Sequence, residues 1–157
     1  MDTQSGVKDT ITVGFDGSEP SLAASQWALA AARAESATIH VVTAYMLKDG
    51  ESIDLSRMRA EAIVNLAAKV DADDAGVVLR AIPGEPTEVL LVCAEDSRLL
   101  VVGRHGTSGI IHSALGSVGD ACARLAGCPV VIVPPVRRIP SRCTDQARWS
   151  RSCDDTI

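Results

Sequence analysis

Three glycines and a serine lie close together in one short stretch, in a pattern that could bind phosphate. They are Gly103, Gly106 and Gly116-Ser117, within the sequence LLVVGRHGTSGIIHSALGS at residues 99–117. Glycine has no Cβ, so a polar ligand can approach main-chain N–H groups closely. A helix over residues 118–127 would add unpaired N–H groups and the positive end of its dipole. Because anions bind at such helix ends, the stretch predicts a phosphate-binding loop.

A simpler interpretation of the same residues is an ordinary surface loop, with Ser117 acting only as the N-cap of the helix. No Gly-Lys-Ser/Thr follows the glycines, and the dinucleotide pattern G-x-G-x-x-G is absent from the stretch. Arg104 and His105 could lend positive charge to a phosphate, although a loop arginine is often simply solvated. The preceding strand, two glycines three residues apart and the Gly-Ser at a helix start together favour phosphate binding.

Asp16 is the carboxylate best placed to act beside such a loop. It follows a β-prone run at residues 10–15 and begins the tripeptide Asp16-Gly17-Ser18. The α/β sheets bind their ligands at the carboxyl ends of their strands. Asp16 could therefore accept a hydrogen bond from a ribose hydroxyl or help to hold Mg²⁺. An aspartate before Gly-Ser is equally a common turn residue, and both interpretations stay open.

Alternating strand and helix patterns must position these two features. The β-prone runs cover residues 10–15, 38–44, 77–82, 99–102 and 129–133. The helical patterns cover residues 22–33, 55–70, a segment that starts at 85–87, and 118–127. This order predicts an α/β fold: a doubly wound, open, five-stranded parallel sheet, Rossmann-like, with strand order 3-2-1-4-5 and helices on both faces. Asp16 and the Gly103 loop would then lie on the two sides of the switch point between the first and fourth strands.

Two of the helices carry apolar residues that we expect to pack against the sheet. Trp27 lies in the alanine-rich helix at residues 22–33. The stripe of the next helix recurs at three- and four-residue steps and consists of Leu55, Met58, Ala62, Leu66 and Val70. This spacing predicts an amphipathic helix that buries the stripe.

The length and net charge of the chain limit the number of domains and the kinds of partner that are expected. The 157 residues suffice for one domain, expected at residues 10–135, with a flexible stretch at 1–9 and a mobile, arginine-containing tail at 136–157. The formal net charge of −5 argues against a nucleic-acid partner, because proteins that bind the phosphate backbone carry a basic face. The polar N-terminus lacks an apolar signal region and no run reaches membrane-spanning length, so no membrane association is expected.

The cysteines favour a reducing, cytoplasmic location and give no sign of catalysis. The five of them cannot all pair, and none has zinc-binding spacing. Cys93, Cys122 and Cys128 lie in apolar patterns and are expected to act as small hydrophobic residues, whereas Cys143 and Cys153 lie in the polar tail. No G-x-S-x-G elbow and no cysteine with an evident histidine partner is present, so no catalytic residue is predicted.

The fifth strand predicts a homodimer. Residues 129–133 read PVVIV, and a strand that begins with proline suits the edge of a sheet. An apolar edge strand invites aggregation unless something covers it. A twofold-related copy that pairs through Val130, Val131, Ile132 and Val133 would cover it.

Taken whole, the glycine stretch resembles the nucleotide-binding motif of the ATP-binding universal stress protein family. It reads Gly103-x2-Gly106-x9-Gly116-Ser117 after Leu100-Val101-Val102. Three further stretches agree with that family, namely VGFDGS at residues 13–18, IHVV at 39–42 and CPVVIV at 128–133. The resemblance spans about residues 10–134, and the combination is far more specific than the glycines alone.

The resemblance implies a binding site. Adenine would be held by main-chain groups near Val41, and ribose would lie near Asp16 and Gly103. Phosphates would lie at Gly106, Gly116, Ser117 and Val118, with Mg²⁺ or Mn²⁺ held beside them by Asp16 and Ser117. The nucleotide-binding residues expected in this way are Gly14, Phe15, Asp16, Val41, Val102, Gly103, Arg104, His105, Gly106, Gly116, Ser117 and Val118.

The function that the resemblance implies is binding of ATP, or of AMP or cAMP, in a stress-response and regulatory role with slow or absent hydrolysis. Two alternatives remain open. The first is a metal-assisted ATPase in which Asp16 and a bound metal activate water. The second is an interaction module that binds no nucleotide and acts through its dimer surface.

Overall fold

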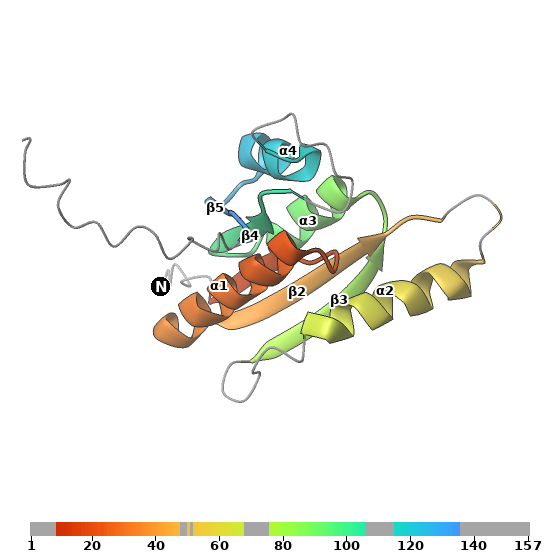
Figure 1. Ribbon diagram of the computed structural model, residues 1–157. Coiled ribbons are helices and arrows are strands. Elements are labelled where there is room, and N and C mark those ends of the chain that lie inside the picture. The colour runs from red at the N-terminus through yellow and green to blue at the C-terminus, as the bar shows by residue number, and fades with distance from the viewer. Residues whose placement is uncertain (1–8, 48–49, 51, 68–75, 106–114, 136–157) are drawn as a thin grey trace, which may run out of the picture.

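The computed structural model describes residues 9–47, 50, 52–67, 76–105 and 115–135, in which strands and helices alternate (Figure 1). The elements are β1 (Thr10–Gly14), α1 (Glu19–Glu35), β2 (Thr38–Tyr45), α2 (Ile53–Ala67), β3 (Val77–Pro83), α3 (Pro86–Ala94), β4 (Leu99–Gly103), α4 (Ser117–Leu125) and β5 (Val130–Val133). Each predicted strand and helix is present. The tail predicted at 136–157 and all but one residue of the stretch at 1–9 lie outside the described residues.

The five strands form one parallel sheet in the order β3-β2-β1-β4-β5. This confirms the predicted α/β fold and its strand order. The register places Val13 beside Val41 on one side and beside Val101 on the other. The chain therefore leaves β1 toward β2 and returns later to β4, so the switch point lies between β1 and β4.

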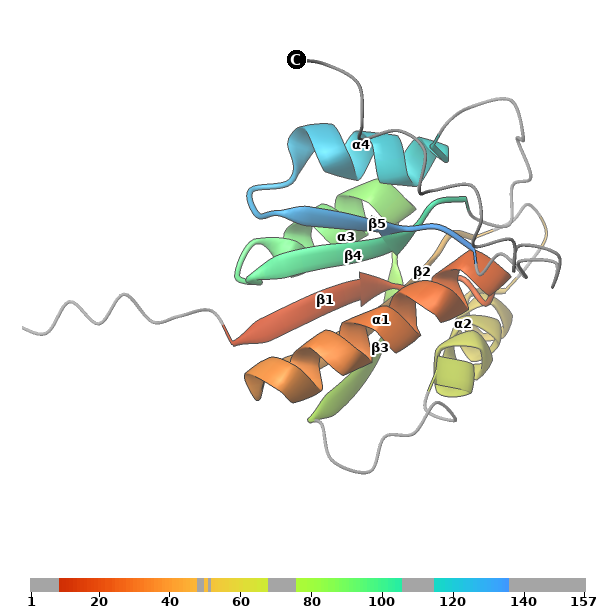
Figure 2. The same cartoon turned by 60° about the vertical axis from the view of Figure 1, so that its left-hand side comes forward.

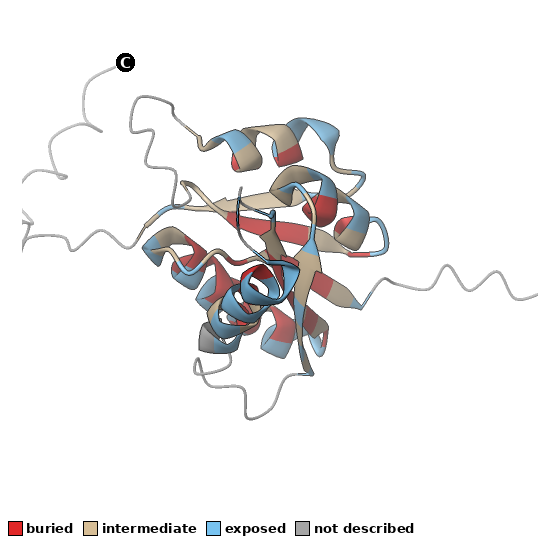
Figure 3. Ribbon diagram, turned by 90° about the vertical axis from the view of Figure 1, so that its right-hand side faces the viewer, coloured by how far each residue is buried: buried red, intermediate tan, exposed pale blue. Residues whose placement is uncertain are grey.

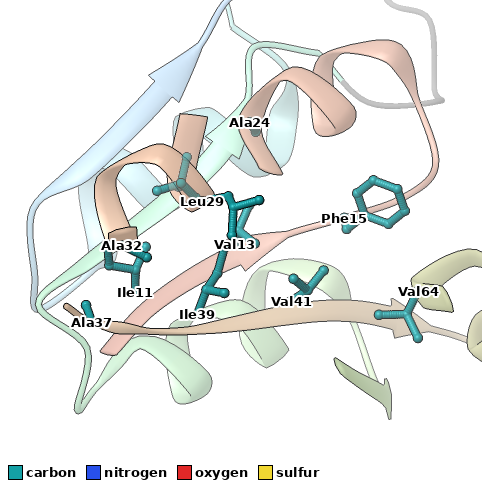
Figure 4. Close-up of a cluster of buried hydrophobic side chains, with 12 residues drawn as sticks. Ile11, Val13, Phe15, Ala24, Leu29, Ala32, Ala37, Ile39, Val41 and Val64 are labelled. Carbon is teal, nitrogen blue, oxygen red and sulfur yellow. The ribbon is translucent and has the colours of Figure 1, made fainter. Parts of the chain in front are cut away.

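Helices cover both faces of this sheet (Figure 2). Side chains alternate between the two faces along each strand. Val13, Val41 and Val101 face α1 and α2 and belong to a first aliphatic cluster, part of which is drawn in Figure 4. Val42 and Leu100 belong to a second cluster on the opposite face, which α3 and α4 cover. Both layers are filled almost entirely by Val, Leu, Ile and Ala, as a chain with 3% aromatic residues requires.

Helix α1 contacts the sheet through alanines, and its tryptophan lies to one side of that contact. Ala24, Ala28 and Ala32 are fully buried. Because their side chains are small, the helix backbone lies close to β1 and β4. Trp27 projects about 100° around the helix from Ala28, and 42% of it is exposed. The prediction that Trp27 packs α1 onto the sheet is therefore wrong.

Helix α2 also buries a different face from the one that the sequence predicts. Ser56, Ala60 and Val64 are buried at a spacing of four residues and contact the sheet. Leu55 and Met58 are 48% and 64% exposed. These two residues of the predicted stripe therefore lie on the outer side of α2, and Figure 3 shows that side in the exposed colour.

The physical reason for this difference is the size of the buried side chains. Ser56 and Ala60 let the backbone of α2 approach the sheet, whereas a face of Leu and Met would hold the helix further away. Ala62 is exposed, like Leu55 and Met58. The side chain of Leu66 and the whole of Val70 lie outside the described residues.

No helix within the described ranges has both the length and the apolar character needed to cross a membrane.

Candidate functional site

The place where a crevice is expected, at the carboxyl ends of β1 and β4, is formed by segments far apart in the sequence. Val13 pairs with Val101, so the residues that follow these two strands emerge side by side at one edge of the sheet. Helix α1 leaves this edge over one face and α4 over the other (Figure 2). The structure thus brings Asp16 and the segment Gly103–Arg104 to the same edge, as the strand order predicts.

Asp16 forms a tight turn with the two residues that follow it. Its Oδ1 accepts hydrogen bonds from the Ser18 main-chain N–H at 3.0 Å and from the Ser18 hydroxyl. Gly17 has a φ of +81°, a conformation that glycine adopts at little cost. The Ser18 Oγ also accepts from the Ser21 N–H at 3.3 Å and so caps α1. One oxygen of the Asp16 carboxylate therefore holds the turn, and the turn aims the start of α1.

Gly14 and Phe15 are bound into the protein on both sides. A Cβ at Gly14 would lie 2.9 Å from the Leu90 Cδ1 of α3, so the absence of a side chain allows α3 to pack closely. Phe15 is buried, and its N–H donates to the Val42 carbonyl at 2.9 Å. The Phe15 carbonyl accepts from the Thr43 hydroxyl at 2.7 Å. These contacts join the end of β1 to β2 and to α3.

Val41 and Val102 contribute their side chains to the core. Val41 is 3% exposed and lies in the first cluster, where Figure 4 shows it on β2. Val102 is 4% exposed and lies in the second cluster. A ligand in the crevice can therefore reach these two residues only through their main-chain atoms.

Gly103 marks the point where α1 contacts β4. A Cβ at this position would lie 2.7 Å from the carbonyl carbon of Pro20 and 2.8 Å from its oxygen. These are backbone atoms, which cannot move aside as the end of a side chain can. Sequence reasoning gave Gly103 a role toward the ligand and missed Pro20 altogether. The available signal was the position of Pro20 in the first turn of α1, because that turn must pass over the neighbouring strand.

The two ends of the β4–α4 loop are held together. The Arg104 N–H donates to the Val133 carbonyl at 2.8 Å, and the Gly116 N–H donates to the Arg104 carbonyl at 2.7 Å. Gly116 is the N-cap residue of α4, and within the described residues no side chain makes a capping hydrogen bond to this helix. Ser117 is the exposed first residue of α4, so the alternative that Ser117 is its N-cap is wrong. Val118, which follows, packs against the second cluster.

His105 adds a polar atom that has no partner. Its Nδ1 is buried and makes no hydrogen bond within the part of the chain that the structure describes. A buried nitrogen without a partner is uncommon in folded proteins and is satisfied by a ligand or water. Gly106, the next residue of the predicted site, lies outside the described residues. Among the described residues, the loop end therefore combines an uncapped helix start with an imidazole nitrogen that has no partner, and both can bind a polar ligand.

Comparison with known proteins identifies the family. The sequence profile described as the universal stress protein family matches residues 8–134, from just before β1 to just after β5. The chain belongs to the universal stress protein family. The match includes every residue of the crevice that the sequence predicts.

Relatives of this universal stress protein agree with the assignment. Universal stress protein Rv1636 of Mycobacterium tuberculosis is 33% identical over 139 residues, which cover 79% of this chain and 94% of the relative. A crystal structure of a universal stress protein in complex with cAMP is 32% identical, with a TM-score of 0.67, and covers 81% of this chain and 97% of its own. The universal stress protein of Archaeoglobus fulgidus in complex with dAMP has a TM-score of 0.65 at 19% identity, over 79% and 96% of the two chains. At that identity the last likeness concerns the fold alone.

A metal in this universal stress protein would depend on few protein ligands. Among the described residues, no group of three or more His, Cys, Asp or Glu side chains could hold an ion. The predicted ligands are the carboxylate of Asp16 and the hydroxyl of Ser117. Mg²⁺ commonly binds through one or two protein oxygens together with substrate phosphates and water. This pair therefore suits an ion that a bound nucleotide helps to hold, and does not suit an independent metal centre.

The cysteines near this universal stress protein's crevice are structural. Cys122 of α4 is fully buried, and burial raises the pKa of its thiol to about 11. The thiol therefore stays protonated near neutral pH and acts as a small core residue, as the sequence predicts. Cys93 and Cys128 are half-buried, and Cys93 and Cys122 form no disulfide within the described residues. Cys143 and Cys153 lie outside the described residues.

Proposed function

We propose that this protein binds an adenine nucleotide, ATP, AMP or cAMP, in the crevice between β1 and β4. The observation that carries the proposal is the start of α4, which no side chain of the described residues caps and which the Gly116–Arg104 hydrogen bond holds beside the end of β4. Helix starts of this kind bind phosphate through main-chain N–H groups. The cAMP complex of a universal stress protein that is 32% identical supports an adenine nucleotide as the ligand.

In this proposal, each part of the nucleotide contacts a different group of residues. The phosphates bind the main chain at Gly106, Gly116, Ser117 and Val118, and Mg²⁺ or Mn²⁺ joins them to Asp16 and Ser117. The ribose lies near Asp16 and Gly103, and adenine lies near the main chain of Val41. The role is regulatory, in a stress response in the cytoplasm, with slow or no hydrolysis. Cys93 and Cys122 form no disulfide within the described residues, which supports a reducing compartment.

Gly116→Ala tests the proposed phosphate site. Gly116 has a φ of −67°, which alanine adopts without strain, so we expect the variant to fold normally. Its methyl group would stand where a phosphate approaches the main chain, and we expect affinity for ATP to fall about tenfold, equivalent to ~1.4 kcal/mol. Isothermal titration with ATP, AMP and cAMP in the presence of Mg²⁺ measures this change.

Gly127→Ala is the matched control for that experiment. A Cβ at Gly127 would meet no atom within 4 Å, and this residue lies beyond the other end of α4. We expect it to bind ATP like the wild type. If the wild-type protein binds none of the three nucleotides, or if the Gly116 and Gly127 variants bind equally well, the proposed phosphate site is refuted.

We also propose that the protein is a homodimer paired through β5. β5 lies at one edge of the sheet, and its side chains are partly exposed. The carbonyls of Pro129 and Val133 accept bonds from β4, so those of the alternate residues Val130 and Ile132 point away from the sheet. A second copy of β5 would pair with these outward groups, and residues 130–133 would form the seam.

Ile132→Pro tests the pairing because proline removes an outward N–H and leaves the bonds to β4 in place. We expect a dimer mass for the wild type in light scattering at micromolar concentration and a monomer mass for this variant. Ile132→Ala loses a comparable part of the side chain but keeps the N–H, so it should remain dimeric. A monomeric wild type, or a dimeric proline variant, would rule out pairing through β5.

A further inference from the structure

A second cleft, of about 540 Å³, lies between α2 and the strands β2 and β3. Its strand wall consists of Tyr45, Leu79, Ala81 and Pro83. Ala81 pairs with Thr43 and Pro83 with Tyr45, so the wall lies at the carboxyl ends of both strands. The small side chain of Ala81 leaves the space open between Leu79 and Pro83. Apart from the Tyr45 hydroxyl, this wall is apolar.

The opposite wall is one flank of α2. It consists of Arg57, Glu61, Val64 and Asn65, which share a helix face because they lie four, seven and eight residues apart. The Arg57 Nε donates to the Glu61 Oε1 at 2.8 Å, so the two charges cancel within the wall. Val64 is 3% exposed and forms the apolar floor.

Polar groups from both walls converge on this space. The Arg57 guanidinium of one wall and the Tyr45 hydroxyl of the other line the same cleft. Within the described residues, neither the Tyr45 hydroxyl nor the Asn65 amide hydrogen bonds to another protein group. An amide offers donors and an acceptor side by side, and a phenol hydroxyl offers one of each. The described walls of the cleft therefore offer hydrogen-bonding groups beside an apolar floor, the usual composition of a small-molecule site.

Helix α2 separates this cleft from the nucleotide crevice. Ile63 lies on the flank of α2 that faces the Asp16 turn, because a Cβ at Gly17 would be 3.4 Å from the Ile63 Cγ2. The centre of the cleft-lining face is roughly 145° around the helix from Ile63, at 100° per residue. A nucleotide seated between β1 and β4 would therefore not fill the cleft.

We propose that this cleft is a second ligand site, which takes a small uncharged heteroaromatic molecule of one or two fused rings. The ring packs against Tyr45 and Pro83, where an offset-stacked arrangement is favourable. Its polar edge exchanges hydrogen bonds with the Asn65 amide and the Glu61 carboxylate. An ionic ligand is disfavoured because Glu61 already neutralises Arg57, and the volume lies within the range of small-molecule pockets.

Tyr45 makes the proposal directly testable because it is the only tyrosine in the sequence. Protein labelled with ¹³C-tyrosine gives ring signals from the cleft alone. The probe is free adenine, an uncharged fused heterocycle, added with and without saturating ATP. We expect a saturable shift of the Tyr45 signals in both conditions, since the two sites are separate. Sodium benzoate, an aromatic anion, should produce no saturable shift.

Asn65→Leu removes the amide while keeping its approximate volume, and it should weaken adenine binding about tenfold or more. Met58→Leu is the control, because Met58 lies on the outer side of the same helix. It should bind adenine like the wild type. A Tyr45 signal that does not shift with adenine, a shift that Asn65→Leu leaves unchanged, a shift that ATP abolishes, or equal binding of benzoate would each overturn the proposal. The outcomes with adenine alone, with Asn65→Leu and with benzoate do not depend on whether ATP binds in the crevice.

Discussion

Gly103→Ala is expected to lower the free energy of unfolding by about 3 kcal/mol. The added methyl group would lie 2.7 to 2.8 Å from backbone atoms of Pro20, closer than carbon atoms approach without repulsion. Relief requires the first turn of α1 to move away from β4, although α1 is otherwise held by the buried alanines on the same face. Urea denaturation followed by circular dichroism should show a lower midpoint with an unchanged slope.

Gly119→Ala provides the contrast within the same region. Gly119 is buried in α4, but a Cβ there would lie 3.8 Å from the Gly103 carbonyl oxygen and from the Val102 Cγ2, an ordinary contact distance. Because alanine is a better helix residue than glycine, this variant should be as stable as the wild type or up to about 1 kcal/mol more stable. If Gly103→Ala instead unfolds like the wild type and only binds nucleotide more weakly, Gly103 serves the ligand and not the contact with Pro20.

These glycines show why the site was only partly predictable. The spacing of Gly103 and Gly116 indicates phosphate, and the structure places Gly116 at an uncapped helix start. Glycine is required at positions 14 and 103 by packing within the protein, because Leu90 and Pro20 occupy the space that a side chain would fill. Those contacts join residues that are 76 and 83 positions apart in the sequence, and no local pattern reveals them.

The strand order was predictable because each strand is a short β-prone run and each connection contains a helix. Which face a helix buries was not. For α1 and α2, hydrophobicity favours Trp27 and Met58, whereas the sheet contacts Ala28 and Ala60. Packing distance decides between these faces, because small side chains allow the backbone to approach more closely. Periodicity alone assigns Trp27 and Met58 to the core, whereas in the structure both are exposed.

The sequence left two roles for Asp16 equal, a turn residue and a ligand contact, and the structure establishes the turn. Its Oδ1 accepts from the Ser18 N–H and hydroxyl. Asparagine offers an oxygen in the same place, so Asp16→Asn should keep the turn and the fold. It removes the negative charge that a ribose hydroxyl or a metal ion would meet.

We therefore expect Asp16→Asn to weaken binding of both ATP and AMP about tenfold or more, with the melting temperature unchanged within error. A hydrogen bond to a charged acceptor contributes about 1.5 to 3 kcal/mol, which corresponds to a change of this size. Asp54→Asn, the same change at an exposed position in the first turn of α2, is the control and should bind both nucleotides normally. Titration calorimetry and thermal unfolding of the three proteins make the comparison.

The same pair of variants separates nucleotide binding from turnover. If the protein is a binding protein, phosphate release from ATP should be slow or absent in the wild type and no different in Asp16→Asn. A metal-assisted ATPase predicts steady phosphate release by the wild type that this substitution abolishes, because the carboxylate would hold the ion that activates water. That result would replace the regulatory role with an enzymatic one. Normal affinity in Asp16→Asn would instead limit Asp16 to the turn and leave the main chain of α4 as the principal contact for the nucleotide.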